Sequence, residues 1–478
     1  MMTKPPLTLA LLLLLATGCS EPASDKPNIL LITLDTTRAD RLGCYGWEAA
    51  KTPNIDALAA RGARFDFALS TAGITPMSHA SILTGLNPYN HGLRVFHGAA
   101  GNKLPPEIAT LPERLSKAGY QTGGFVSAYP LSPYYGLNQG FDAYSTGIEE
   151  TLAGIDLTQP VRSLQENILL DKDRSRVQRR ADATTSEALD WLEGRDPSAP
   201  WFTWIHFFDA HDISLVPPAA WAEEHGVLYA EAPHQRDLTG RESFYDLEIA
   251  WMDAQLGRLF QWLEESEQLD NTIVVLTADH GQGLSRGEKL HSWSRHRLIY
   301  QWSIHVPLIV AGPMVPSPAS INAIVRTTDI APTLLELLDL APEEPMDGSS
   351  LTSLMGGAEE APRIAYADAL NTRDSFAPLS RLPELCRDDL IAATDGRHKL
   401  IHHLKEPHKS ELYDLQLDPD EQDNLYTKKP ELASRLHSFL LTEGALSINE
   451  AAYGREAPDQ DALRGLGYTG DAEESEER

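Results

Sequence analysis

The chain of 478 residues carries 40 lysines and arginines against 69 aspartates and glutamates, which gives a net charge of −29. A chain this acidic is poorly suited to broad contact with a phosphate backbone, so we expect no nucleic-acid partner. Hydrophobic residues make up 42% and charged residues 23%, a composition that excludes a wholly disordered chain or a protein with many membrane spans. The three cysteines, Cys19, Cys44 and Cys386, are too few for a disulfide framework.

Residues 1–19 have the pattern of a targeting segment. Lys4 supplies a positive start, and residues 7–16 (LTLALLLLLA) form a short apolar run. A membrane-spanning helix needs about 20 apolar residues, so this run is more typical of a signal peptide.

The end of this segment, Ala16-Thr17-Gly18-Cys19, resembles a bacterial lipobox. This predicts an exported lipoprotein, lipidated on Cys19 and facing the periplasm or the cell surface. Ser20 stands where Asp would signal retention in the inner membrane, which favours the outer membrane. The alternative is an ordinary signal peptide that ends near a cysteine. Residues 20–27 are polar and are expected to form a tether.

From residue 28 to residue 385, short apolar runs alternate with helical patterns. Continuous apolar runs are typical of strands buried on both faces of a parallel sheet. Such runs lie at residues 28–34, 121–126, 201–208, 272–276 and 306–310, and helical patterns lie at 110–119 and 244–265. The alternation predicts an α/β catalytic domain with a mostly parallel sheet flanked by helices.

The pattern changes after residue 385. Residues 390–394 and 398–403 flank Asp395-Gly396, a turn signal for an antiparallel hairpin. Residues 411–415 have the pattern of a third strand, and residues 430–441 that of an amphipathic helix. We therefore expect a small antiparallel sheet with a helix over residues 386–445, followed by a tail over residues 446–478.

Polar residues follow two of the predicted strands at the edge where open α/β sheets place their ligands. Asp35 comes directly after the first strand, and Asp279 and His280 follow the strand at 272–276. A carboxylate beside an imidazole suits a divalent cation. Helix capping and an ordinary polar loop are the alternatives.

Three further segments carry candidate functional groups. Thr75-Pro76 precedes a helical stretch, where free N–H groups favour an anion, although a threonine N-cap followed by proline is common. Residues 206–212 hold two histidines and two aspartates, a set that rarely fills a core. Lys289, His291 and His296 lie further along, in a region rich in glycine and serine.

In their order along the chain, these segments resemble the sulfatase family of the alkaline-phosphatase-like superfamily. The matching motifs are NILLITLDTTRADRLGCYG, TPNIDALAARGARFDFA, SILTG, DAHD, IVVLTADHG, HVPLIV, TTDIAPTLLELL, DGSSL and ELYDLQLDPDEQDNL. The resemblance covers roughly residues 27–445 and implies an alkaline-phosphatase-like fold and a hydrolase acting on ester bonds.

The resemblance also implies a metal site. The family binds one divalent cation, usually calcium, and manganese, magnesium and zinc are the alternatives here. The family's ligand positions fall on Asp35, Thr75, Asp279 and His280. Its second acidic ligand falls on Thr36, which can offer only a neutral oxygen.

The catalytic positions implied by the resemblance are Thr75 as the nucleophile and His211 as the group that binds the anion or protonates the leaving group. A further lysine or histidine of the family falls among Lys289, His291 and His296. True sulfatases oxidise a cysteine or serine to formylglycine, whereas threonine cannot be oxidised in this way. The resemblance therefore implies a formylglycine-free site.

Thr75 leaves the class of ester open. A formylglycine hydrate expels sulfate by collapsing to the aldehyde, whereas a threonine phosphate is easier to turn over than a threonine sulfate. Thr75 therefore favours phosphate or phosphonate esters, whereas family membership favours sulfuric esters. The substrate is expected to be a small anionic ester or a sulfated or phosphorylated glycan or lipid. A headgroup transferase and a non-catalytic binding lipoprotein remain as alternatives.

Overall fold

The computed structural model describes residues 26–96, 103–147, 178–211, 217–225, 238–284, 298–316, 319–374 and 384–448. Cys19 with the rest of the targeting segment, and Lys289, His291 and His296, lie outside these ranges. Among the described helices, none combines the length and the apolar character that crossing a bilayer requires.

The larger of two sheets has eight strands in the order β4-β3-β5-β1-β6-β7-β2-β8. Strand β7 runs antiparallel to both of its neighbours, and every other described pairing in this sheet is parallel. The mostly parallel α/β sheet predicted from the sequence is therefore confirmed. Its strands are β1 (Asn28–Leu34), β2 (Ala63–Leu69), β3 (Gln121–Phe125), β4 (Ala143–Ser145), β5 (Trp201–Phe207), β6 (Thr272–Ala278), β7 (His305–Ala311) and β8 (Ala319–Arg326).

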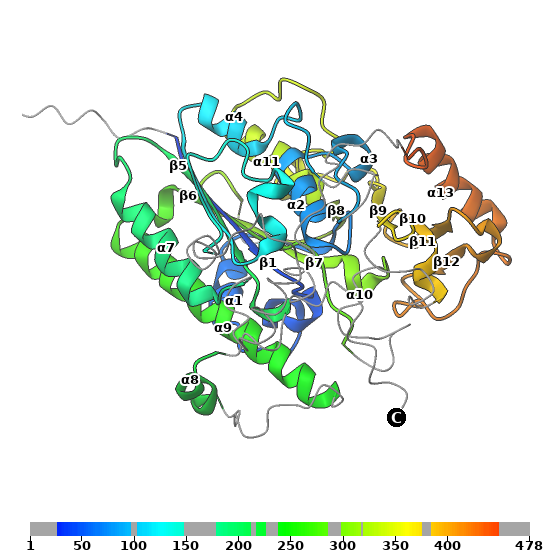
Figure 1. Cartoon of the computed structure of the whole chain (residues 1–478), viewed down its shortest axis with the longest axis horizontal. Helices are drawn as coiled ribbons and strands as arrows, with labels where there is room; N and C mark the ends of the chain where they lie inside the picture. The colour runs from blue at the N-terminus through cyan, green and yellow to red at the C-terminus, as the bar shows by residue number, and fades with distance from the viewer. Residues whose placement is uncertain are drawn as a thin grey trace, which may run out of the picture.

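Helices cover both faces of this sheet (Figure 1). Alternate residues of β1 point to opposite faces: Ile29 and Leu31 pack on one side, and Leu30 and Ile32 on the other. Burying each of these side chains stabilises the fold by ~1.5–3 kcal/mol. The helices of the first side are α2 (Thr75–Thr84), α4 (Leu111–Lys117) and α11 (Ile330–Leu337), and those of the second are α1 (Pro53–Ala60), α7 (Ala181–Gly194) and α9 (Leu238–Glu265).

Helix α4 shows how local sequence sets its own boundaries. The Thr110 side chain accepts a hydrogen bond from the Glu113 backbone N–H, and the Glu113 carboxylate accepts one from the Thr110 N–H, so a capping box starts the helix. Gly119, with φ 90°, lies directly after the helix in the left-handed conformation that glycine adopts without strain. The helix predicted at residues 110–119 is confirmed.

The second sheet has four antiparallel strands in the order β12-β11-β10-β9. It lies at one end of the molecule with α13 packed against it (Figure 1). Strand β9 comes from the chain before residue 386, so the small sheet takes a strand from the segment that we assigned to the catalytic domain. The elements of this end are β9 (Ala365–Leu370), β10 (Asp389–Thr394), β11 (His398–His403), β12 (Glu411–Asp414) and α13 (Pro430–Thr442). The remaining short helices are α3 (Pro88–His91), α8 (Ala219–Glu224), α10 (Gln301–Ile304) and α12 (Thr352–Met355).

Hydrogen bonds connect the small sheet to the loop that leads into α2. The Asp368 backbone N–H of β9 donates to the Thr71 carbonyl at 3.0 Å. The buried Arg94 guanidinium donates to the Asp368 carboxylate at 2.9 Å and to the Ser447 carbonyl at 3.0 Å. These bonds tie the chain just before Thr75 to the C-terminal part of the protein.

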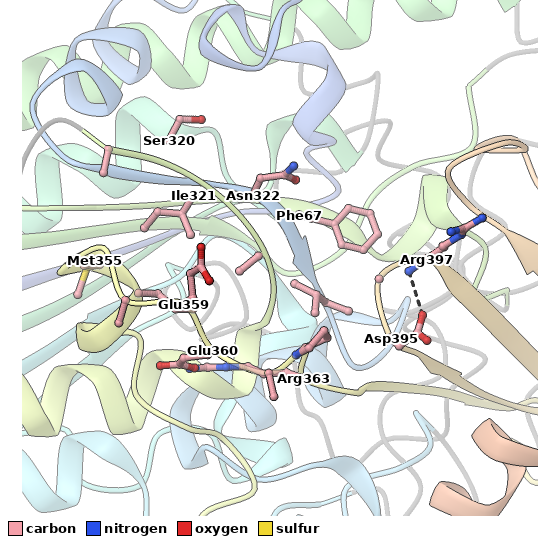
Figure 2. A pocket seen from close by; sticks show the side chains of 18 of the residues that line it. Phe67, Ser320, Ile321, Asn322, Met355, Glu359, Glu360, Arg363, Asp395 and Arg397 are labelled. Atoms are coloured by element: carbon pink, nitrogen blue, oxygen red, sulfur yellow. Dashed lines mark hydrogen bonds and ion pairs between the residues drawn. The ribbon is translucent and has the colours of Figure 1, made fainter.

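A pocket of ≈ 940 Å³ lies where the β8 edge meets the β10–β11 turn (Figure 2). Phe67 and Ile321 line it from the large sheet, Arg363 from the chain after α12, and Asp395 and Arg397 from the turn. Its lining contains none of the polar residues predicted at the strand ends. The candidate site is therefore a different part of the molecule.

Candidate active site

The register of the three central strands brings two carboxylates together. Leu34, the last residue of β1, pairs with Phe207 of β5 and Ala278 of β6. Asp35 and Asp279 therefore leave neighbouring parallel strands side by side, and both are completely buried. Asp35, Asp279 and His280 each offer a ligand atom within 4.8 Å of the others.

Thr36 holds this pair in place through its backbone. Its N–H donates to Asp279 Oδ1 at 3.1 Å, and its hydroxyl donates to the Asp35 carbonyl at 2.8 Å. Thr36 makes these bonds with a φ of 54°, a left-handed backbone conformation that is costly for a β-branched residue. The Tyr245 hydroxyl donates to the Thr36 carbonyl at 2.7 Å and fixes the turn.

Thr75 is the first residue of α2, and Ile74 occupies the N-cap position. The Thr75 hydroxyl donates to Asp35 Oδ2 at 3.3 Å and lies 3.4 Å from His280 Nε2. The helix has no side-chain cap hydrogen bond at its N-cap residue. The alternative in which Thr75 serves as the N-cap is therefore wrong, because its hydroxyl faces the carboxylate and the imidazole.

The ring of His280 is oriented by a hydrogen bond at Nδ1. Nδ1 lies 3.0 Å from the Gly281 carbonyl, which can only accept, so Nδ1 carries a hydrogen. Nε2 faces Thr75 Oγ1 and Asp279 Oδ2, each 3.4 Å away. A histidine that donates its other N–H to a backbone carbonyl is oriented as metal-binding histidines are.

The two buried carboxylates need a positive partner. Burial and the neighbouring Asp279 carboxylate raise the pKa of Asp35 well above its usual range. Burial also disfavours ionisation of Asp279, but His280, His79 and His206 hold the pKa of this carboxyl below its ordinary value. Asp35 Oδ1 and Asp279 Oδ2 have no hydrogen-bond partner among the described residues.

A divalent cation fits these donors. The separation of 3.4 Å between Thr75 Oγ1 and His280 Nε2 is close to that between neighbouring ligands of one ion with bonds of about 2.0–2.4 Å. The two unpartnered carboxylate oxygens and the lone pair of His280 Nε2 are the groups that such an ion would satisfy. Asp35, Asp279, His280 and Thr75 would hold it.

Two further histidines belong to this cluster and were not among the predicted site residues. His79 Nδ1 donates to the Thr75 carbonyl at 2.8 Å, and its Nε2 lies 3.0 Å from Thr33 Oγ1. His206 Nδ1 accepts from the Ser127 N–H at 3.4 Å, so its Nε2 donates to Asp35 Oδ2 at 3.2 Å. Burial lowers the pKa of each ring to about 3, so both are neutral.

The sequence spacing indicates the position of His79, and the strand register explains that of His206. His79 lies four residues after Thr75, which places the two on one face of α2. His206 pairs with Thr33 in the β1–β5 register, two residues before Asp35. Since both ring nitrogens of each histidine already have hydrogen-bond partners, these residues position Thr75 and Asp35 and are not free to bind a metal ion.

His211, which the sequence suggested as a catalytic group, lies at the same end of β5 as His206. It is buried and stacks on Phe208 with ring centroids 4.2 Å apart. The histidine of this segment that contacts the carboxylate pair is His206. The other three predicted catalytic residues, Lys289, His291 and His296, fall outside the described residues.

Comparison with known proteins identifies the family. The sulfatase family profile matches residues 27–340, and that of the C-terminal region of N-sulphoglucosamine sulphohydrolase matches residues 287–443. This chain belongs to the sulfatase family, and it is an ester-hydrolysing enzyme. The family membership expected from the motifs is confirmed.

Three relatives illustrate the range of the likeness. Arylsulfatase K of Mus musculus is 24% identical, covering 87% of this chain and 78% of its own length. N-acetylglucosamine-6-O-sulfatase of Bacteroides thetaiotaomicron is 24% identical, with coverage of 88% and 87%. The crystal structure of the phosphonate monoester hydrolase of Agrobacterium radiobacter superposes with a TM-score of 0.67 at 22% identity, covering 88% of this chain and 96% of that one. The structural likeness shows the fold alone.

Proposed function

We propose that the protein hydrolyses an anionic ester by attack of the Thr75 hydroxyl, with a divalent cation held by Asp35, Asp279 and His280. The observation that carries this proposal is the position of Thr75 Oγ1, at the start of α2, between Asp35 Oδ2 and His280 Nε2. A hydroxyl becomes a nucleophile when an adjacent group accepts its proton, and Asp35 Oδ2, to which the hydroxyl already donates, is within reach here.

Each step of the reaction has a residue to perform it. Thr75 Oγ1 forms a bond to the sulfur or phosphorus of the ester while the bond to the leaving oxygen breaks. The positive end of the helix dipole at the start of α2 favours the anionic group. A bound divalent cation would neutralise charge on the transferred oxygens. His211 protonates the leaving oxygen. Water then attacks the covalent ester and gives a proton back to His211, while Thr75 Oγ1 regains its proton from Asp35 as the free acid anion leaves.

Sulfate esters of glycans are the substrate class that the family favours. Two of the relatives named above are an arylsulfatase and a sulfatase of N-acetylglucosamine. Phosphate and phosphonate esters are a second candidate, favoured by one observation: Thr75 is a hydroxyl nucleophile and cannot expel sulfate by collapse to an aldehyde. Turnover of a threonine ester requires attack of water, which is easier at phosphorus.

A substrate panel tests both candidates. An aryl sulfate, an aryl phosphate, a bis-aryl phosphate and an aryl phosphonate would be assayed with the protein loaded with Ca²⁺, Mn²⁺, Mg²⁺ or Zn²⁺. Hydrolysis of the sulfate alone assigns a formylglycine-free sulfatase, and preference for a phosphorus ester assigns the second candidate. If no ester is hydrolysed with any of the four ions, the proposal is wrong.

We also propose that the mature protein is an exported lipoprotein that is anchored to the membrane through Cys19. The apolar run at residues 7–16 and the ATGC sequence support this. In a bacterial host, Cys19→Ala should move the protein from the membrane fraction to the soluble fraction, because the acylated side chain is lost. Cys44→Ala is the matched control and should stay with the membrane. Unchanged membrane association of Cys19→Ala, or an intact mass showing cleavage elsewhere, would contradict it.

A further inference from the structure

We infer that the cation site of this protein selects zinc over calcium. The inference builds on the cation position in the proposed function, but it does not depend on which ester is hydrolysed. The family resemblance pointed to calcium, which takes six to eight oxygen ligands, often with carboxylates that bind through both oxygens. The donors that surround this site are of a different number and kind.

Each carboxylate has one oxygen already occupied by hydrogen-bond donors. Asp279 Oδ1 accepts from the backbone N–H groups of Thr36 and His280, at 3.1 and 2.8 Å. Asp35 Oδ2 accepts from His206 Nε2 at 3.2 Å and from the Thr75 hydroxyl at 3.3 Å. Only Asp35 Oδ1 and Asp279 Oδ2 remain without a hydrogen-bond partner among the described residues. Each carboxylate is therefore set up to bind an ion through one oxygen.

The third donor is a ring nitrogen. Because His280 Nδ1 donates to the Gly281 carbonyl, Nε2 is the nitrogen that faces the two carboxylates and Thr75. Imidazole nitrogen suits zinc and is a poor ligand for calcium. Together with the Thr75 hydroxyl, the described residues supply two carboxylate oxygens, one nitrogen and one hydroxyl, a set of the size and type that zinc accepts.

Thr36 does not supply the acidic oxygen that the family places at its position. It stands at the position of the family's second acidic ligand, and its hydroxyl donates to the Asp35 carbonyl at 2.8 Å. The neighbouring histidines do not compensate, because His79 and His206 direct N–H groups at an oxygen of Thr75 and of Asp35. The described residues therefore offer a calcium ion fewer oxygens than the six to eight that it takes.

Direct metal binding tests the inference without any substrate. The full chain would be stripped with a chelator and titrated with Zn²⁺ and Ca²⁺ by calorimetry, and bound metal would be counted by mass spectrometry. We expect one Zn²⁺ per chain and an affinity at least 100-fold above that for Ca²⁺. Binding of Co²⁺ in place of Zn²⁺ should give the visible absorption of a low-coordinate site with a nitrogen ligand.

Two variants should shift the metal preference from Zn²⁺ toward Ca²⁺. His280→Asn replaces the nitrogen with an amide oxygen and should lower the Zn²⁺/Ca²⁺ affinity ratio at least tenfold. Thr36→Asp restores an acidic oxygen and should raise Ca²⁺ affinity, and aspartate tolerates the left-handed backbone better than threonine does. His402→Asn, whose ring contacts Ser410 in the small sheet, is the matched control and should leave the ratio unchanged.

The outcomes separate this inference from the proposed function. Tighter binding of Ca²⁺ than of Zn²⁺, or a Zn²⁺/Ca²⁺ affinity ratio that His280→Asn and Thr36→Asp leave unchanged, overturns the zinc assignment while hydrolysis through Thr75 stands. If the folded chain binds neither ion, both the zinc assignment and the cation of the proposed function are wrong. Circular dichroism of each variant confirms that it is folded before the titration.

Discussion

Replacing Thr75 with alanine should reduce kcat/KM by on the order of 10⁴-fold or more, because the substitution removes the attacking oxygen. The fold should survive, since the contacts of the hydroxyl with Asp35 and His280 are long, at 3.3 and 3.4 Å, and Ile74 is the N-cap of α2. Thr75→Ser keeps the oxygen and loses only a methyl group, so it should retain part of the activity. Steady-state assays with thermal unfolding as the folding check measure both effects.

Ser78 and Cys44 serve as controls for the identity of the nucleophile. The Ser78 hydroxyl donates to the Asp279 carbonyl at 2.7 Å and supports the start of α2. Burial, followed by the nearby Asp56 carboxylate, raises the pKa of the Cys44 thiol to about 12, so Cys44 is not a thiolate at neutral pH. We expect Cys44→Ala to stay active. Mass spectrometry of the trapped covalent enzyme should place the label on Thr75, and a label on Ser78 would refute the assignment.

Replacing Asp279 with asparagine should abolish metal binding and activity together. The substitution keeps an oxygen that can accept from the Thr36 and His280 N–H groups, but it removes the charge and the unpartnered Oδ2. In the native protein, a cation at 100 times its Kd should stabilise the fold by about 2.7 kcal/mol. In Asp279→Asn this stabilisation should disappear, which thermal unfolding with and without metal detects.

Asp209→Asn is the matched control for Asp279→Asn. Asp209 is also a buried aspartate at the end of a central strand, but its carboxylate accepts from the Ala181 N–H at the start of α7. Burial raises the pKa of Asp209 to about 8, so the neutral amide resembles the form present at pH 7. We expect Asp209→Asn to bind metal as the native chain does. Equal metal content in Asp279→Asn and the native chain would contradict the ligand assignment.

Several strands depend on local sequence patterns and could be predicted from the sequence alone. The apolar runs that became β1, β5, β6 and β7 were evident, because strands buried on both faces need continuous hydrophobic residues. Strands β2 and β8 were not predicted, since polar side chains interrupt both and their pairing partners lie far along the chain. Strand β9 was missed because its role depends on pairing with β10.

The candidate site also has features that the sequence determined and features that only the structure showed. The sequence determined that Asp35, Thr75, Asp279 and His280 stand at the ends of strands or the start of a helix, because these positions follow from local patterns and from the family motifs. Only the tertiary structure decided that His79 and His206 hold Thr75 and Asp35, and that one oxygen of Asp35 and one of Asp279 have no hydrogen-bond partner within the described part of the chain. Hydrogen bonds between elements depend on strand register and helix packing, which bring together residues as distant in sequence as Thr36 and Asp279.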